Sequence, residues 1–272
     1  MSTSRPSIAE VRAVSQAGVL ERRSAEHWAG RLYMRTLSGW VTRWVVSTRA
    51  LERVTPDQLT LLMIVVGLAA GGVVALWPGW WAALVAFVLI QGYLLLDCVD
   101  GEVARWRRTT SARGVYLDRL GHHVVESALV VGLGFRAAGG FVERVVGASG
   151  GPEASGWMVL GALAALLVVL GKLESDLVVL ARASAGLPAA PEADATSSVS
   201  TVRSLRRIFA VVPLHRLIGA VELTLLLLVA AIVDAVRADL LATQVLLAAT
   251  AAVALLVAVG HPVTILTSRR LQ

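Results

Sequence analysis

Several apolar runs constrain this chain most, because a helix of roughly 20 apolar residues crosses the hydrocarbon core of a bilayer. Four such runs are clear, and they extend from Pro56 to Trp77, Trp80 to Leu96, Gly156 to Gly171 and Leu240 to Val259. Hydrophobic residues make up 56% of the chain and charged residues 16%, a balance too apolar for an ordinary soluble domain. The runs therefore predict an all-α, polytopic membrane protein.

Two further segments have some polarity but are close to the length of a spanning helix. They run from Gly114 to Phe135 and from Leu214 to Val233. With them the chain is predicted to form a bundle of six transmembrane helices over residues 55–268. No internal repeat and no second soluble domain is evident.

The basic residues predict the orientation, because cytoplasmic flanks of spanning helices accumulate Lys and Arg. If both termini are cytoplasmic, all but three of the 25 Lys and Arg residues lie on the inner side. The exceptions are Arg136, Arg144 and Arg237. We therefore expect an integral protein of the cell (plasma) membrane with both termini and the active site in the cytoplasm. The net charge of +6 reflects this topology and not nucleic-acid binding.

The segments that flank the bundle are polar or amphipathic. Residues 1–25 are predicted to be a polar N-terminal tail, and residues 269–272 a cytoplasmic tail. Within residues 26–54, Trp40 and Trp44 recur with other apolar residues at helical spacing, and Arg31, Arg35 and Arg43 are interleaved. This pattern predicts an amphipathic helix that lies on the cytoplasmic membrane surface before the first span.

Ionisable residues gather at the ends of two apolar segments, where charge is costly and therefore points to function. Asp97 and Asp100 are three residues apart, and Asp118 and His122 are four apart. On helices each pair lies on one face. A hairpin between the two helices can thus bring three carboxylates and one imidazole together at the membrane surface.

A divalent cation would relieve the repulsion between carboxylates held so close. Carboxylate oxygens favour hard ions such as Mg²⁺ or Mn²⁺, and Mg²⁺ keeps open positions for substrate phosphates. Gly101 and Ala104 would let a substrate approach the helix, and Arg105 could contact a phosphate. These residues indicate phosphate chemistry at a membrane interface.

The same residues resemble the signature of the CDP-alcohol phosphotransferase, or CDP-alcohol phosphatidyltransferase, family. That signature is D-x-x-D-G-x-x-A-R, about eight residues, and then G-x-x-x-D-x-x-x-D. Seven positions agree in register, namely Asp97, Asp100, Gly101, Ala104, Arg105, Gly114 and Asp118. Thr55 to Thr60 also resembles the T-P-N-x-x-T entry to the family's first span, with Asp57 where Asn is usual.

The resemblance implies six spans, frequent homodimers, and transfer of a substituted phosphoryl group from a CDP-alcohol to an acceptor hydroxyl with release of CMP. It implies two divalent ions. Asp97, Asp100 and Asp118 would hold metal, and His122 would complete the site. The residues expected to cradle the CDP portion are Gly101, Ala104, Arg105, Gly114 and Asp57.

His122 departs from the family pattern, because it replaces the fourth aspartate, which helps to hold the second metal and activates the acceptor hydroxyl. A neutral imidazole can ligate a metal or accept a proton near neutral pH, although it cannot easily do both at once. His122 and Asp118 are thus the expected catalytic residues, and Glu126, one turn further on, is expected to orient His122. The chain could be an active variant, a weakened or inactive member, or an enzyme in which another residue supplies the lost function.

The expected donor is CDP-diacylglycerol, because an interfacial site suits a lipid whose chains stay in the bilayer, and a water-soluble CDP-polyol is the alternative. The acceptor is an alcohol or a polyol phosphate, for which clustered basic residues, including Lys172 and those from Arg203 to Arg216, could form a pocket. Two other classes are a transporter, which would show repeated halves or broken helices, and a non-catalytic membrane interaction protein. Binding of CDP or CMP with and without Mg²⁺ distinguishes all three.

Overall fold

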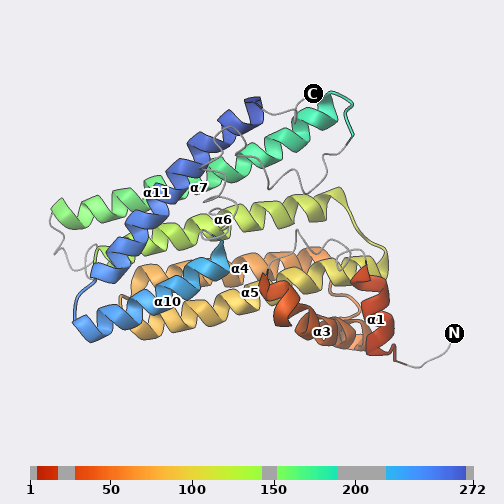
Figure 1. The fold of residues 1–272 in the computed structure, drawn as a ribbon. Coiled ribbons are helices and arrows are strands. Elements are labelled where there is room, and N and C mark those ends of the chain that lie inside the picture. The colour runs from red at the N-terminus through yellow and green to blue at the C-terminus, as the bar shows by residue number, and fades with distance from the viewer. Residues whose placement is uncertain (1–4, 18–27, 143–151, 189–218, 268–272) are drawn as a thin grey trace. The chain divides into compact units, whose positions relative to one another are not determined.

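Helices are the regular elements throughout the described part of the chain, as expected. The computed structural model describes residues 5–17, 28–142, 152–188 and 219–267 (Figure 1). The elements are α1 (Ile8–Ser15), the π-helix η1 (Gly30–Met34), α3 (Arg35–Ser47), the 3₁₀-helix η2 (Arg49–Leu51), α4 (Pro56–Leu76), α5 (Trp80–Arg107), α6 (Ala112–Ala137), α7 (Pro152–Ser184), α10 (Ala220–Arg237) and α11 (Leu241–Thr267).

Within the described residues, four helices are long and apolar enough to cross a membrane, and they correspond to the four clear apolar runs. These segments are Pro56–Leu76, Trp80–Arg107, Glu153–Ser184 and Leu241–Val263. The helices α5 and α7 extend well beyond the apolar runs, because backbone hydrogen bonding continues through the charged residues that follow. The long apolar helices make this an integral membrane protein.

The predicted count of six spans is not reached among the described residues. The helix α10 has only 18 residues, and three of them are charged: Glu222, Asp234 and Arg237. In α6, two histidines and several charged residues make the helix more polar than the other long helices. Spanning by α6 and α10 therefore stays a prediction.

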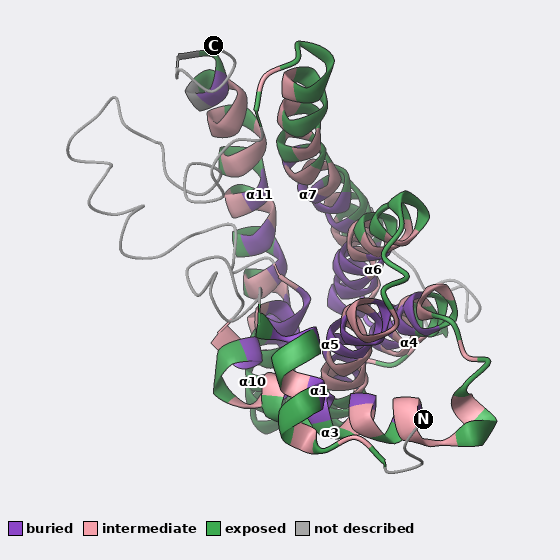
Figure 2. Cartoon of the chain, turned by 90° about the vertical axis from the view of Figure 1, so that its right-hand side faces the viewer, coloured by how far each residue is buried: buried purple, intermediate pink, exposed green. Residues whose placement is uncertain are grey.

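Apolar side chains remain exposed along α7, which packs beside α11 (Figure 1). Leu163, Leu166 and Leu180 are each more than half exposed, and much of α7 is coloured exposed or intermediate in Figure 2. Exposed apolar surface of this kind fits contact with lipid, since a helix in a membrane gains nothing by hiding leucine from hydrocarbon.

The chain divides into two units, Met1–Gly67 with Leu89–His122, and Leu68–Val88 with His123–Gln272. In the first unit, α3, α4 and α5 share an apolar core built on Val45, Leu59, Val99 and Val103. This core fixes the C-terminal half of α5, which contains the predicted metal ligands, against α3 and the start of α4.

The first 25 residues, predicted to be a polar tail, include a helix. The N-terminus of α1 has a capping box, in which the Ser7 hydroxyl accepts from the Glu10 amide while the Glu10 carboxylate accepts from the Ser7 amide. Val11 of α1 is fully buried, and α1 packs on α3. The described part of this segment is thus structured.

The amphipathic character of α3 follows the prediction. Trp40 is 53% exposed and Trp44 61%, whereas Ser38 and Thr42 are fully buried on the opposite face. The exposed tryptophans suit the interface between lipid and water. Placement of this helix at the membrane surface is still a prediction.

Arg136, counted above among the outer basic residues, is a buried structural residue of the second unit. Its side chain is fully buried at the C-terminal end of α6. The guanidinium donates to the carbonyl oxygens of Trp77 and Gly79 and to the hydroxyl of Thr243, which itself donates to Asp234. Arg136 thus joins the turn after α4 to the start of α11.

Candidate active site and metal centre

The site is built on the hairpin of α5 and the first part of α6, within the first unit. Arg108 ends α5 in the left-handed conformation with φ of 55°, and the Thr109 amide donates to the Ala104 carbonyl, 2.9 Å away, as in a Schellman motif. The Ser111 hydroxyl then accepts from the Gly114 amide at 3.0 Å and caps α6. This short turn folds the start of α6 back along α5.

The hairpin brings Asp97, Asp118 and His122 together. His122 Nε2 lies 3.2 Å from Asp97 Oδ1 and 3.5 Å from Asp118 Oδ1. The three side chains are 24%, 42% and 34% exposed in that order, so a substrate can reach them. The spacing of these residues on two helices, read from the sequence, anticipates this meeting.

The same three residues fit a divalent cation. One ligand atom from each, two carboxylate oxygens and an imidazole nitrogen, lies within 4.8 Å of the others. Hard oxygen ligands suit Mg²⁺ and Mn²⁺, and Mn²⁺ also accepts imidazole nitrogen. A metal centre on Asp97, Asp118 and His122 is therefore compatible with the geometry.

Asp100 lies outside this three-residue group. Its side chain is only 6% exposed, and its Oδ2 accepts from the Thr60 hydroxyl at 2.5 Å. Thr60 thus connects α4 to α5 at Asp100. We call α5 the motif helix, because it contains the first part of the family signature, from Asp97 to Arg105. The prediction that Asp100 is a metal ligand is neither confirmed nor contradicted by this contact, because the second carboxylate oxygen can still bind an ion.

Gly101, Ala104 and Arg105 line the next turn of α5. A methyl group added at Gly101 would lie 3.1 Å from Nη1 and 3.4 Å from Nη2 of Arg105, so the guanidinium lies close against the helix at residue 101 and would have to shift slightly to admit a side chain there. Ala104 is buried. Arg105 Nε donates to the carbonyl oxygen of Ser15, 2.5 Å away.

Gly114 and Asp57 come together where α4 and α6 begin. A methyl group at Gly114 would lie 3.7 Å from Asp57 Oδ1. Asp57 forms an ion pair with Arg113 at 3.1 Å, and the Arg113 side chain is 75% exposed. Two of the five residues that the resemblance assigns to CDP binding, Gly114 and Asp57, are therefore neighbours.

Tyr93 is a site residue that the sequence reasoning missed. Its hydroxyl lies 2.5 Å from His122 Nδ1, and its ring packs edge-on against the imidazole at 5.7 Å between centroids. Glu126, expected to orient His122, instead forms an ion pair with Lys172 at 2.6 Å. The signal was available, because Tyr93 precedes Asp97 by four residues and so shares its helix face.

Replacing Tyr93 with Phe should weaken metal binding about 10- to 100-fold, as removal of a group that orients a metal-ligating histidine does in other sites. The ring keeps its packing, so the protein should fold. The measurement is the Mn²⁺ concentration that gives half-maximal nucleotide binding. Tyr33→Phe, which removes a hydroxyl bonded to Gln91, is the matched control, and an equal effect of both variants would contradict this role of Tyr93.

Further polar side chains pair within the second unit. His123 contacts Asp176 at 3.4 Å, and Glu174 contacts His261 at 3.3 Å. Together with the ion pair of Lys172 and Glu126, these contacts place the acidic side chains Glu126, Glu174 and Asp176 opposite a lysine or an imidazole. The basic residues from Arg203 to Arg216, considered above for an acceptor pocket, lie outside the described residues.

Comparison with known proteins agrees with the motif. The model of the CDP-alcohol phosphatidyltransferase family matches residues 53–267, most of the chain, including both helices of the hairpin. No curated protein matches the chain.

Proposed function

Because the chain belongs to the CDP-alcohol phosphatidyltransferase family, whose members are transferases of substituted phosphate groups, we propose that it transfers a phosphatidyl group from CDP-diacylglycerol to the hydroxyl of an alcohol or polyol phosphate. CMP is the second product. The observation that carries this proposal is the meeting of Asp97, Asp118 and His122 at a partly exposed position on the motif hairpin. Phospholipid synthesis is the corresponding role.

A lipid donor is favoured by the place of the site. The motif residues follow directly on the apolar part of α5, a helix able to span the membrane. The acyl chains of CDP-diacylglycerol could stay in the bilayer while its diphosphate reaches the carboxylates. A water-soluble CDP-polyol would not need such a location.

Asp97, Asp118 and His122 would hold a divalent ion, Mg²⁺ or Mn²⁺, and Asp100 would join them if a second ion is bound. Such an ion supplies neutralisation of the diphosphate charge and stabilises CMP as the leaving group. Arg105 would donate to a phosphate oxygen from its terminal nitrogens, beside Gly101. Ala104, Gly114 and Asp57 would complete the surface that receives the CDP portion.

The two ring nitrogens of His122 have different partners: Nδ1 contacts the Tyr93 hydroxyl, which orients the ring, and Nε2 faces the carboxylates, where it can react. When Nδ1–H donates to the Tyr93 oxygen, the lone pair of Nε2 is directed toward Asp97 and Asp118. That lone pair can ligate metal or take the proton of the acceptor hydroxyl. In the second role His122 acts as the general base, and Asp118 holds the resulting imidazolium by its negative charge.

The direct test is an assay of the purified protein with CDP-diacylglycerol, Mg²⁺ and one candidate acceptor at a time. Inositol phosphate, glycerol phosphate and serine are the first acceptors to supply. CMP release together with a new phospholipid, identified by mass spectrometry, supports the proposal. A product confined to the aqueous phase would favour a CDP-polyol donor, and metal-independent or absent CDP binding would favour a weakened member that acts as a membrane interaction protein.

We further propose six spans, including α6 and α10, with both termini and the active site in the cytoplasm of a plasma-membrane homodimer. In a Cys98→Ser background, which removes the single native cysteine, Val14→Cys and Ala185→Cys should react with a membrane-impermeant thiol reagent only from the cytoplasmic side. Asp239→Cys, in the turn after α10, should react only from outside. Labelling of Asp239→Cys from the cytoplasm would exclude the six-span topology.

A further inference from the structure

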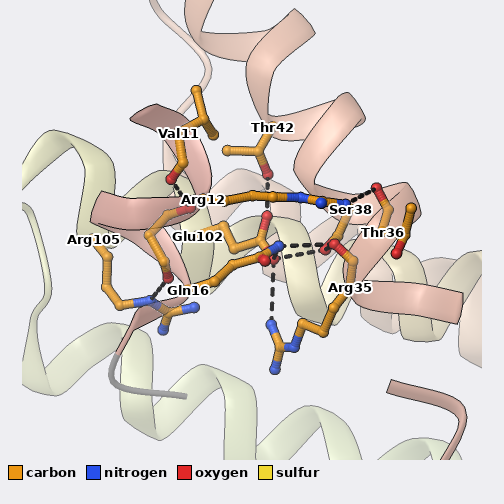
Figure 3. Close-up of polar contacts among 10 residues, drawn as sticks. Val11, Arg12, Gln16, Arg35, Thr36, Ser38, Thr42, Glu102 and Arg105 are labelled. Carbon is orange, nitrogen blue, oxygen red and sulfur yellow. Dashed lines mark hydrogen bonds and ion pairs between the residues drawn. The ribbon is translucent and has the colours of Figure 1, made fainter. Parts of the chain in front are cut away.

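The motif helix contains a carboxylate that neither the metal centre nor the family signature uses. Glu102, next to Gly101, is fully buried and accepts four hydrogen bonds (Figure 3). The donors are Ser38 Oγ at 2.6 Å, Thr42 Oγ1 at 2.7 Å, Gln16 Nε2 at 2.8 Å and Arg35 Nη1 at 3.4 Å. A charge at this depth is stable only because these donors and the Arg35 cation surround it.

Glu102 thereby joins three helices of the first unit. Gln16 is the C-cap of α1, the hydroxyl donors come from α3, and Glu102 lies on α5. The Gln16 amide also donates to the carbonyl oxygen of Arg35 at 2.8 Å, so its two hydrogens bridge α3 and α5. The hydrogen bond from Gln16 to Glu102 therefore holds the C-terminal end of α1 against α5.

A second bond joins the end of α1 to the motif arginine. The Ser15 carbonyl accepts from Arg105 Nε, and the two terminal nitrogens of Arg105 lie beside Gly101. Because a guanidinium is planar, an acceptor on Nε sets the plane in which the terminal nitrogens lie. The bond therefore fixes the orientation of the guanidinium, with the forked end of Arg105 beside Gly101.

Close packing keeps α1 in this position. A methyl group at Gly39 of α3 would lie 3.1 Å from Arg12 Nε and 3.4 Å from Gln16 Nε2. A side chain at residue 39 must therefore shift the Arg12 and Gln16 side chains of α1, and a large one must push against α1 itself. Gly39 offers a way to move α1 without touching Glu102 or Arg105.

We infer that α1, anchored by Glu102, orients Arg105 and so sets the affinity of the site for the diphosphate of its donor. Glu102 and Gln16 are positioning residues, since they touch Arg105 only through α1 and the motif helix. The inference rests on the proposed function, in which Arg105 contacts a donor phosphate. The N-terminal segment is then part of the substrate-binding apparatus and not a tail.

The test compares the KM for the CDP donor and the Kd for CDP, with Mn²⁺ present, in variants that move α1. Gln16→Glu places a carboxylate against two acceptors, Glu102 and the Arg35 carbonyl, and Gly39→Leu displaces α1 sterically. Each should raise KM and Kd about tenfold, the value of one well-oriented bond to a charged group, while kcat at saturating donor stays within about twofold. Val14→Ala on the exposed side of α1 should change neither constant.

A second substitution distinguishes a positioning role of Gln16 from a general loss of structure. Adding Glu102→Gln to Gln16→Glu supplies an amide donor opposite the new carboxylate, so KM and Kd should return toward the wild-type values even if Gly39→Leu fails to fold. The inference would be overturned if Gln16→Glu left KM and Kd unchanged or lowered kcat alone. It would also be overturned if the double variant had the same KM and Kd as Gln16→Glu. Wild-type protein that binds CDP but releases no CMP would refute the proposed function and leave the Kd comparison decisive, whereas absence of CDP binding would overturn both.

Discussion

Replacing Asp118 with Asn should lower CMP release by on the order of a thousandfold, since a lost metal ligand removes several kcal/mol of charge stabilisation from the transition state. The amide keeps the size of the side chain but not its charge. CMP release is measured at saturating donor over a range of Mn²⁺ concentrations. Asp239→Asn, which disrupts an exposed ion pair with Arg237, is the matched control and should leave turnover unchanged.

The same substitution at Asp97 should have a similar effect, because both carboxylates contact the same imidazole nitrogen. Asp100→Asn tests whether a second ion is bound, since Asp100 lies outside the three-residue group and is bonded to Thr60. Full turnover in a well-folded Asp118→Asn protein would remove the metal centre from the proposal. Unchanged turnover in Asp100→Asn would restrict the centre to the three residues.

Replacing His122 with Ala should reduce kcat about 100- to 10,000-fold, the usual contribution of a positioned general base. His122→Asp restores the family signature and should keep or raise activity. Both variants are compared with wild type for kcat and for the Mn²⁺ concentration at half-maximal rate. A reduced kcat with unchanged metal dependence would identify His122 as the base, and a raised metal requirement would identify it as a ligand.

Full activity of His122→Ala with unaltered metal dependence would show that the residue is neither base nor essential ligand. His123→Ala is the control on the adjacent position, because His123 contacts Asp176 instead of the metal ligands. Glu126 would not be a ready substitute, since Lys172 already pairs with it.

Local properties of the chain were sufficient to predict the helices, the hairpin and the three side chains that it brings together. A run of apolar residues identifies a span by its own length and composition. The pairing of Asp97 with Asp118 and His122 follows from helical periodicity and a short turn, both encoded within 26 consecutive residues. The family signature lies in the same stretch, which is why it could be read without a structure.

Tertiary structure alone decided which groups surround those side chains. Tyr93 could be placed on the correct helix face, but its contact with His122 depends on how two helices pack. Helix packing also explains why Glu126, expected to orient His122, forms an ion pair with Lys172 instead. Glu102 is the clearest case. Its donors lie 60 to 86 residues away in sequence, so Glu102 looks like a variable position of the signature until α1 and α3 are seen to pack against it. The long-range hydrogen bonds of a buried carboxylate produce no periodic pattern in the sequence, so these bonds could not be predicted from it. The contact between the end of α1 and Arg105 could not be predicted for the same reason.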